Sequence, residues 1–141
     1  MEKDNRQAVI QLIDVEKSFK KQQVLKKINL SIMEGTTMVI VGASGQGKSV
    51  LLKHMLGLMK PDSGEVKVFG KDLAKIRKKE LKEVRKSYGV LFQNVALFDS
   101  MNIFDNIALP LRERTKATEE EIRANVEEKL SMMDLTGAGE K

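Results

Sequence analysis

The stretch that decides the fold is Gly42-Ala43-Ser44-Gly45-Gln46-Gly47-Lys48-Ser49, which follows the pattern G-x-x-x-x-G-K-[ST]. An apolar run at residues 38–41 precedes it, and a stretch with helical character, residues 50–59, follows it. A phosphate-binding loop requires this order of strand, glycine-rich loop and helix, because the first helical turn aims unpaired N–H groups and positive dipole at the anion. The sequence therefore predicts a polyphosphate site.

The residue types of this loop suggest separate roles. Glycines at positions 42, 45 and 47 let the backbone approach phosphate oxygens with no Cβ in the way. Lys48 would bring positive charge to the β- and γ-phosphates, and the Ser49 hydroxyl would hold a Mg²⁺ ion that bridges the same oxygens. The rest of the predicted phosphate-binding set is Gly42, Ala43, Ser44, Gly45, Gln46, Gly47 and Val50. A glycine-rich turn without a ligand is the weaker alternative, because four fixed positions coincide with the strand and helix context.

Composition limits the classes of protein. The 141 residues are 41% apolar and 32% charged, which allows one folded core and argues against disorder. No run approaches the length of a membrane helix and the start resembles no secretory leader, so we expect a soluble unit. Zero cysteines exclude disulfides, thiolate zinc sites and cysteine nucleophiles. The net charge of +5 suits a polyphosphate ligand, but it suits nucleic acid or an anionic membrane equally.

Strand patterns dominate the N-terminal part. Residues 9–15 and 29–32 are predicted to form antiparallel strands. Residues 38–41 lack polar side chains, which is typical of a central parallel strand buried on both faces. The sequence thus predicts a small antiparallel sheet joined to a parallel core.

A hairpin is predicted after the first helix. Turn residues at 60–64 and 70–72 flank a short alternating strand at 65–69. Residues 88–92 resume strand character and end at Gln93. The single histidine, His54, has no partner at metal-ligand spacing, so we expect it on the surface of its helix. The methionines at positions 55 and 59 are expected to fill the core.

Residues 71–86 contain eight basic and three acidic side chains. Apolar side chains recur among them at helical spacing, namely Leu73, Ile76, Leu81 and Val84. This pattern predicts an amphipathic surface helix. Because no aromatic side chains are interleaved to stack on bases, we expect no nucleic-acid partner.

Two features mark the C-terminal third. Thr118-Glu119-Glu120-Glu121 has the form of a capping box, and it predicts a helix from Glu119 to about Met133. The apolar stripe of this helix must pack on something, and it consists of Ile122, Val126, Leu130 and Met133. An earlier apolar run, Val95-Ala96-Leu97-Phe98, ends at Asp99, which is an alternative magnesium ligand.

The order of these motifs resembles the first half of an ABC transporter ATP-binding subunit. The resemblance runs from about Ile10 to the end of the sequence. It is carried by the glycine-rich loop and by four further runs: Val24-Leu25-Lys26-Lys27-Ile28-Asn29-Leu30-Ser31-Ile32, Leu51-Leu52-Lys53-His54-Met55-Leu56-Gly57-Leu58, Pro61-Asp62-Ser63-Gly64 and Val90-Leu91-Phe92-Gln93. Within that family, Gly45-Gln46-Gly47-Lys48-Ser49-Val50 and the segment at residues 96–112 are most similar to the Mla type, which serves phospholipid trafficking and organic-solvent tolerance.

The resemblance implies an α/β P-loop NTPase fold with a RecA-like core and an N-terminal antiparallel β subdomain. It implies ATP and Mg²⁺ as cofactors. Phe19 would stack on adenine, in place of the commoner tyrosine. Gln93 would be the catalytic glutamine that touches the metal or the attacking water and relays nucleotide state. If Phe19 has no such role, it is an ordinary core aromatic.

The same resemblance implies partners and a location. They are a membrane permease, contacted through residues 98–110, and a second ATP-binding subunit. The protein would be cytoplasmic and peripheral on the inner face of the membrane. Residues 1–93 would form the N-terminal part of the nucleotide-binding domain, and residues 94–141 the Q-loop and the start of a helical subdomain.

The 141 residues contain no LSGGQ-type signature, no Walker B aspartate with a catalytic glutamate, and no switch histidine. We therefore expect a truncated domain that binds nucleotide without turnover, because a phosphate loop alone does not place the attacking water. Unpaired strand edges and an unpaired helical stripe predict marginal stability. Two alternatives remain: a small kinase or GTPase that uses Asp99 for metal, and a noncatalytic interaction module.

Overall fold

The computed structural model describes residues 6–91 and 97–141, which form two units, residues 6–88 and 89–141. The division predicted between positions 93 and 94 falls within the segment outside these ranges and stays a prediction. Among the described residues, no helix is both long enough and apolar enough to span a bilayer. Each unit has its own buried cluster.

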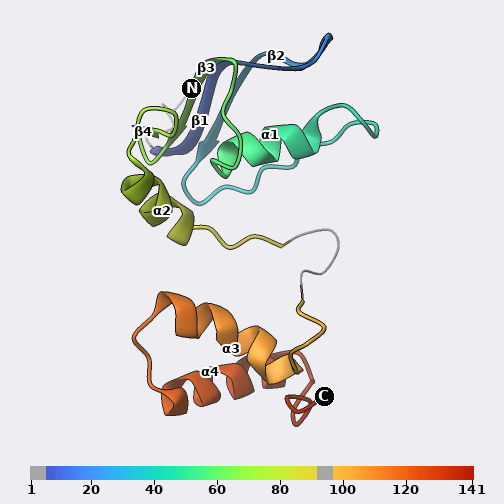
Figure 1. Ribbon diagram of the computed structural model, residues 1–141, viewed down its shortest axis with the longest axis vertical. Helices are drawn as coiled ribbons and strands as arrows, with labels where there is room; N and C mark the ends of the chain where they lie inside the picture. The colour runs from blue at the N-terminus through green and yellow to red at the C-terminus, as the bar shows by residue number, and fades with distance from the viewer. Residues whose placement is uncertain (1–5, 92–96) are drawn as a thin grey trace. The chain divides into compact units, whose positions relative to one another are not determined.

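The first unit is built on a sheet with the strand order β2-β1-β3-β4 (Figure 1). β1 (Ala8–Phe19) and β2 (Gln22–Met33) form a long antiparallel hairpin in which Leu12 faces Leu30. β3 (Ser63–Val68) pairs antiparallel with the other edge of β1, and β4 (Lys71–Asp72) pairs antiparallel with β3. The predicted antiparallel sheet and the predicted hairpin at the third strand are confirmed.

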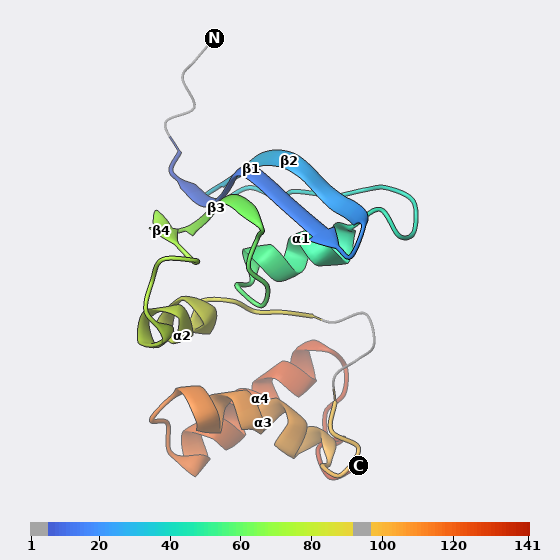
Figure 2. The ribbon, with the colours of Figure 1, turned by 45° about the horizontal axis from the view of Figure 1, so that its top comes forward.

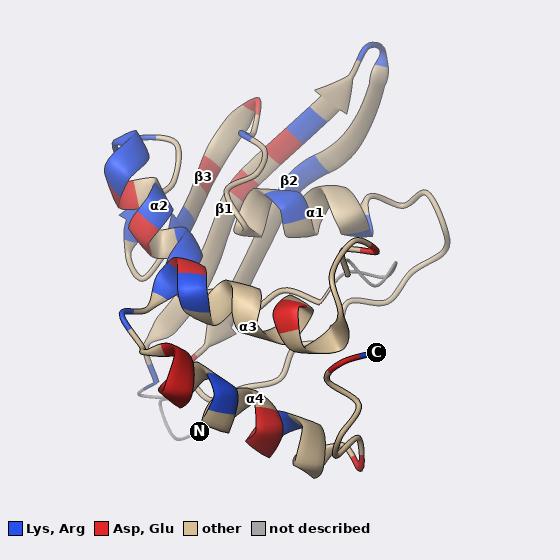
Figure 3. Ribbon diagram, turned by 60° about the horizontal axis from the view of Figure 1, so that its bottom comes forward, with Lys and Arg blue, Asp and Glu red and all other residues tan. Residues whose placement is uncertain are grey.

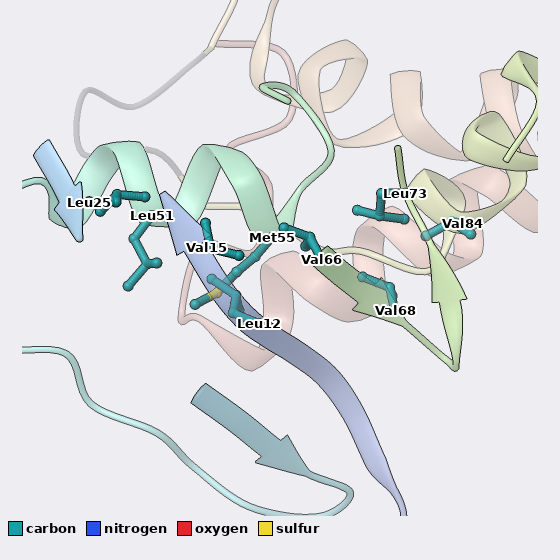
Figure 4. Packing of buried hydrophobic residues seen from close by; sticks show 9 residues of the cluster. All are labelled: Leu12, Val15, Leu25, Leu51, Met55, Val66, Val68, Leu73 and Val84. Carbon is teal, nitrogen blue, oxygen red and sulfur yellow. The ribbon is translucent and has the colours of Figure 1, made fainter. Parts of the chain in front are cut away.

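Helix α1 (Lys48–Met55) covers one face of this sheet, with its N-terminal end toward the β1–β2 turn (Figures 1 and 2). Leu51 and Met55 of α1 enter the same buried cluster as Leu12 of β1 and Val66 of β3 (Figure 4). The methionine at position 55 is core, as predicted. The helix ends earlier than the predicted position 59, because Gly57 adopts a φ of 63°.

The predicted strand at residues 38–41 is absent, which corrects the sequence interpretation. No strand is assigned to these residues, and Val39 and Val41 are 76% and 85% exposed. A central parallel strand needs a neighbour on each side to satisfy its backbone groups. No described strand pairs with this segment, so the apolar pattern has no sheet to join.

His54 also differs from expectation: it is fully buried instead of lying on the helix surface. Its Nδ1 lies 2.7 Å from the carbonyl oxygen of Val50, one turn earlier in α1. Its Nε2 is buried and has no hydrogen-bond partner among the described residues. Leu51, His54 and Met55 share the buried face of α1, which is why the imidazole is enclosed.

The basic helix is shorter than predicted: α2 spans Lys78–Lys86. Lys71 and Asp72 instead pair with β3, and the Asp72 carboxylate accepts a hydrogen bond from the backbone of Ala74 at 3.0 Å, which favours a turn. Val84 is buried, while most of the other residues of α2 are charged (Figure 3). Residues 88–91 form no strand, which is a second correction with the same cause as that at 38–41.

The second unit pairs helices α3 (Ile103–Arg114) and α4 (Glu119–Met132). The predicted capping box is present: the Thr118 hydroxyl accepts from Glu121 N at 3.3 Å, and the Glu121 carboxylate accepts from Thr118 N at 2.7 Å. The expectation of an unpaired stripe is wrong, because Ile122, Val126 and Leu130 pack on α3. Met133 lies outside this contact and is 73% exposed.

Candidate functional site

The turn that leads into α1 has the backbone of a phosphate cradle. Gly45 and Gly47 have φ values of 79° and 88°, in the left-handed region that L-residues rarely adopt. Gly47 also lies against β2, because a Cβ built on it would come within 2.8 Å of Val24 Cγ1. Glycine is therefore required at position 47 by conformation and by packing.

Helix α1 begins directly at Lys48, with Gly47 as its N-cap. Within the described parts of the chain no side chain caps the helix there, and its first turn contains no acidic residue. The N–H groups and positive dipole end of the first turn therefore meet no carboxylate from the helix itself. This arrangement favours an anion in front of α1.

The Lys48 ammonium lies inside the loop, where it donates to the carbonyl oxygens of Gly42 at 2.6 Å and Ala43 at 2.8 Å. Residues 42–46 and Ser49 are exposed. The loop is thus wrapped around a cation and open to solvent. These residues fit a polyphosphate: Lys48 and the backbone N–H groups would hold its oxygens.

Magnesium fits the same place through the Ser49 hydroxyl and the phosphate oxygens of the nucleotide. The described ranges contain no group of three or more His, Cys, Asp or Glu side chains able to hold a metal ion by themselves. A metal at this loop would therefore depend on the bound phosphates for much of its coordination.

Phe19 stands at the end of β1, beside the turn into β2. It is 43% exposed, so it is not the core aromatic considered as the alternative. The neighbouring part of β2 reaches the loop through Val24 and Leu25, which approach Gly47. The hairpin end that carries Phe19 and the loop that carries Lys48 thus belong to one packed corner of the first unit.

The geometry of this corner gives no information on the predicted roles of two other residues. Gln93 lies outside the described residues and stays a prediction. Asp99 belongs to a turn of the second unit, just before α3, so the geometry around Lys48 neither supports nor opposes its use as a metal ligand.

Sequence reasoning missed one residue beside this corner. The sequence predicts Asp62 only as a turn former, but its carboxylate accepts hydrogen bonds from Lys17 Nζ at 2.6 Å and from Ser18 N at 2.7 Å. The hydrogen bond from Lys17 holds the pKa of Asp62 below its usual value. Turn propensity explains an aspartate at this position on its own, so the sequence offers no separate signal for the ion pair.

Comparisons with known proteins agree with this geometry. The ABC transporter family matches residues 25–140. The probable ribonucleotide transport ATP-binding protein mkl of Mycobacterium bovis is 45% identical over 94% of this chain and 37% of its own length. The methionine import protein MetN of Clostridium acetobutylicum is 44% identical over 91% of this chain and 40% of its length. The intermembrane phospholipid transport protein MlaF of Haemophilus influenzae is 42% identical over 82% of this chain and 44% of its length.

Solved structures give the same picture. The dimeric ATP-binding cassette MJ0796 superposes with a TM-score of 0.81 at 32% identity, over 94% of this chain and 60% of the cassette. The same cassette bound to ADP and phosphate gives a TM-score of 0.80 at 33% identity, over 94% of this chain and 61% of that one. The P-loop NTPase fold class is therefore confirmed. The chain spans about two fifths of the length of the curated relatives it matches. It belongs to the ABC transporter family.

Proposed function

We propose that this chain provides the ATP-binding site of a transporter subunit that energises the passage of a lipid or another hydrophobic substrate through a membrane permease. The observation that carries the nucleotide part is the packed corner in which Lys48 lies inside an open glycine-rich loop at the start of α1. A cassette at 33% identity is described as bound to ADP and phosphate, which supports the same ligand class here.

The roles we assign follow the residues of that corner. Lys48 and the backbone of residues 42–50 hold the phosphates, and Ser49 helps to hold Mg²⁺. The exposed ring of Phe19 stacks on the adenine base. Gln93 acts beside the metal or the attacking water. ATP bound with Mg²⁺ supplies the free energy for transport.

The permease is proposed to contact residues 98–110. The start of this segment carries exposed apolar side chains: Phe98 is 54% exposed and Met101 is 38% exposed. Exposed apolar groups gathered in one segment favour a protein contact. We further propose a second ATP-binding subunit as partner, and a location on the inner face of the membrane.

The lipid substrate is supported by the phospholipid-transport relative and by the sequence of residues 96–112. Other relatives at similar identity are named for ribonucleotide and methionine transport. The identity of the permease therefore tests the substrate class separately from nucleotide binding.

Nucleotide binding is tested by titrating the chain with fluorescent MgATP. Lys48→Ala should abolish binding, because the charge inside the loop is lost. Lys53→Ala is the matched control, since Lys53 is an exposed lysine of the same helix. Equal binding by the wild type and Lys48→Ala would refute the assignment of this loop.

The permease and substrate class are tested by purifying the protein with its membrane partners in detergent and identifying the permease by mass spectrometry. A lipid-transport permease that is lost in Phe98→Asp supports the proposal. Leu58→Asp is the control, because Leu58 is 55% exposed in the first unit and lies outside residues 98–110. Recovery of an amino-acid permease would refute the lipid assignment, and retention after Phe98→Asp would refute the contact surface.

A further inference from the structure

Hydrogen bonds join the turn Pro61-Asp62-Ser63-Gly64 to the C-terminal part of β1. Asp62 N donates to the carbonyl oxygen of Glu16 at 2.9 Å, and the Ser63 hydroxyl donates to the Glu16 carboxylate at 2.9 Å. Gly64 has a φ of 83°, and a Cβ on it would lie only 2.3 Å from the carbonyl oxygen of Asp14. The close approach of this turn to β1 therefore depends on glycine at position 64.

The Asp62 carboxylate accepts a hydrogen bond from β1 beyond the point where β1 stops pairing with β3. The pairing of β1 with β3 ends at Glu16 opposite Ser63. Two residues further along β1, Ser18 N donates to Asp62 Oδ2 at 2.7 Å. A side-chain oxygen thus replaces the strand carbonyl that would otherwise accept this N–H.

The other oxygen of Asp62 holds Lys17. Lys17 Nζ lies 2.6 Å from Asp62 Oδ1, and the same nitrogen lies 5.8 Å from the centroid of the Phe19 ring. The side chain of Lys17 is only 16% exposed, so its ammonium is held in place. Asp62 therefore holds two groups beside Phe19: the backbone N–H of Ser18, which precedes it, and the Lys17 ammonium, which lies over its ring.

We propose that Asp62 is a positioning residue for the nucleotide base. By fixing Ser18 and Lys17, it sets the orientation in which the ring of Phe19 receives adenine. This inference rests on the proposed nucleotide site, and it adds the turn at residues 61–64 to that site. Asp62 itself touches neither the base nor the phosphates.

The test separates base binding from phosphate binding. Dissociation constants are measured for MgATP and for magnesium tripolyphosphate, which has the phosphates but no base. Asp62→Ala should weaken MgATP binding by about 3- to 10-fold, the range expected for disturbing one aromatic stacking contact, and leave tripolyphosphate binding within about 2-fold. The MgATP affinity of Asp62→Asn should fall between those of the wild type and Asp62→Ala, because its side-chain oxygen still accepts from Ser18 while the charge partner of Lys17 is lost.

Asp72→Ala is the matched control. Asp72 also pairs with a lysine, Lys75 at 3.0 Å, and accepts from a backbone N–H, that of Ala74 at 3.0 Å, but it does so at β4. The ratio of MgATP affinity to tripolyphosphate affinity should be the same in Asp72→Ala as in the wild type.

The outcomes that contradict the inference differ from those that contradict the proposed function. An unchanged ratio in Asp62→Ala, together with a lost preference for MgATP in Phe19→Ala, would overturn the role of Asp62 and leave the nucleotide site intact. An equal loss of both ligands in Asp62→Ala would show a general structural effect and also overturn it. Binding of neither ligand by the wild type would remove the proposed function and this inference together.

Discussion

Asn106 holds both backbone groups of Phe98: its Oδ1 accepts from Phe98 N at 2.7 Å, and its Nδ2 donates to Phe98 O at 3.1 Å. The same amide nitrogen also approaches the carbonyl oxygens of Met101 at 3.0 Å and Asn102 at 3.0 Å. One side chain of α3 therefore shapes the loop whose exposed residues we assign to the permease contact.

Replacing Asn106 by alanine should loosen this loop without unfolding α3. Losing the hydrogen bonds of the Asn106 side chain should destabilise the ordered loop by about 1 kcal/mol. Amide hydrogen exchange at Phe98 should then become about fivefold faster. Asn125→Ala in α4 is the control, because the side-chain oxygen of Asn125 has no hydrogen-bond partner in the described parts of the chain. Unchanged exchange at Phe98 would show that the loop is held by other contacts.

Gly47→Ala should disturb the start of α1 through a contact with Val24. The substituted residue would have to adopt a φ of 88°, and its Cβ would lie 2.8 Å from Val24 Cγ1. Gly70→Ala is matched for backbone strain, since Gly70 has a φ of 75° and an added Cβ there would meet no atom of the described residues within 4 Å. We expect both to lose about 1 kcal/mol from strain, and Gly47→Ala to lose about 1–3 kcal/mol more from the clash.

Urea unfolding followed by circular dichroism measures this difference. Adding Val24→Ala to Gly47→Ala should restore part of the loss, because it removes the atom that clashes. Equal effects of the two glycine substitutions would contradict the proposed contact between β2 and the loop.

Local signals make much of this structure predictable. The capping box at Thr118 and Glu121 fixes the start of α4, because its hydrogen bonds join residues three apart. The glycine-rich loop is likewise recognisable, since the positive φ values at Gly45 and Gly47 require that residue type. Features that depend on neighbours close in sequence are therefore predicted well.

Features that depend on distant partners are not predictable in this way. The apolar run at residues 38–41 has a strand pattern, but no described strand pairs with it. The resemblance predicts the start of a helical subdomain within residues 94–141 but gives no bounds for α3, and Pro110 inside this helix is a residue that by propensity disfavours helix. The lack of metal-ligand partners suggests a surface position for His54, although it shares the buried face of Leu51 and Met55.

Glu65→Gln should reduce stability in neutral solution and have no effect at strongly acidic pH. Hydrogen bonds from Lys67 and Lys75 lower the pKa of Glu65 from 4.5 to about 2. A carboxylate with a depressed folded-state pKa contributes stability above its unfolded pKa and loses it as the pH falls through the folded value. The difference between wild type and variant should therefore be complete above about pH 4.5 and vanish near pH 2.

The measurement is a series of urea unfolding curves between neutral pH and pH 2. Glu120→Gln is the control, because Glu120 lies in the first turn of α4, far along the chain from β3. A Glu65→Gln difference that does not change with pH would contradict the ion pairs around β3.

His54→Met should preserve or raise the free energy of unfolding, although it replaces a fully buried polar residue. The buried Nε2 of His54 has no partner among the described residues, and an unsatisfied buried polar group costs about 1–3 kcal/mol. Methionine fills a similar volume beside Leu51 and Met55 and has no such cost. His54→Ala should instead lose about 2–4 kcal/mol, because it leaves a cavity under α1. Thermal unfolding of the wild type, His54→Met and His54→Ala ranks their stabilities. A large loss of stability in His54→Met would mean that Nε2 has a hydrogen-bond partner in solution.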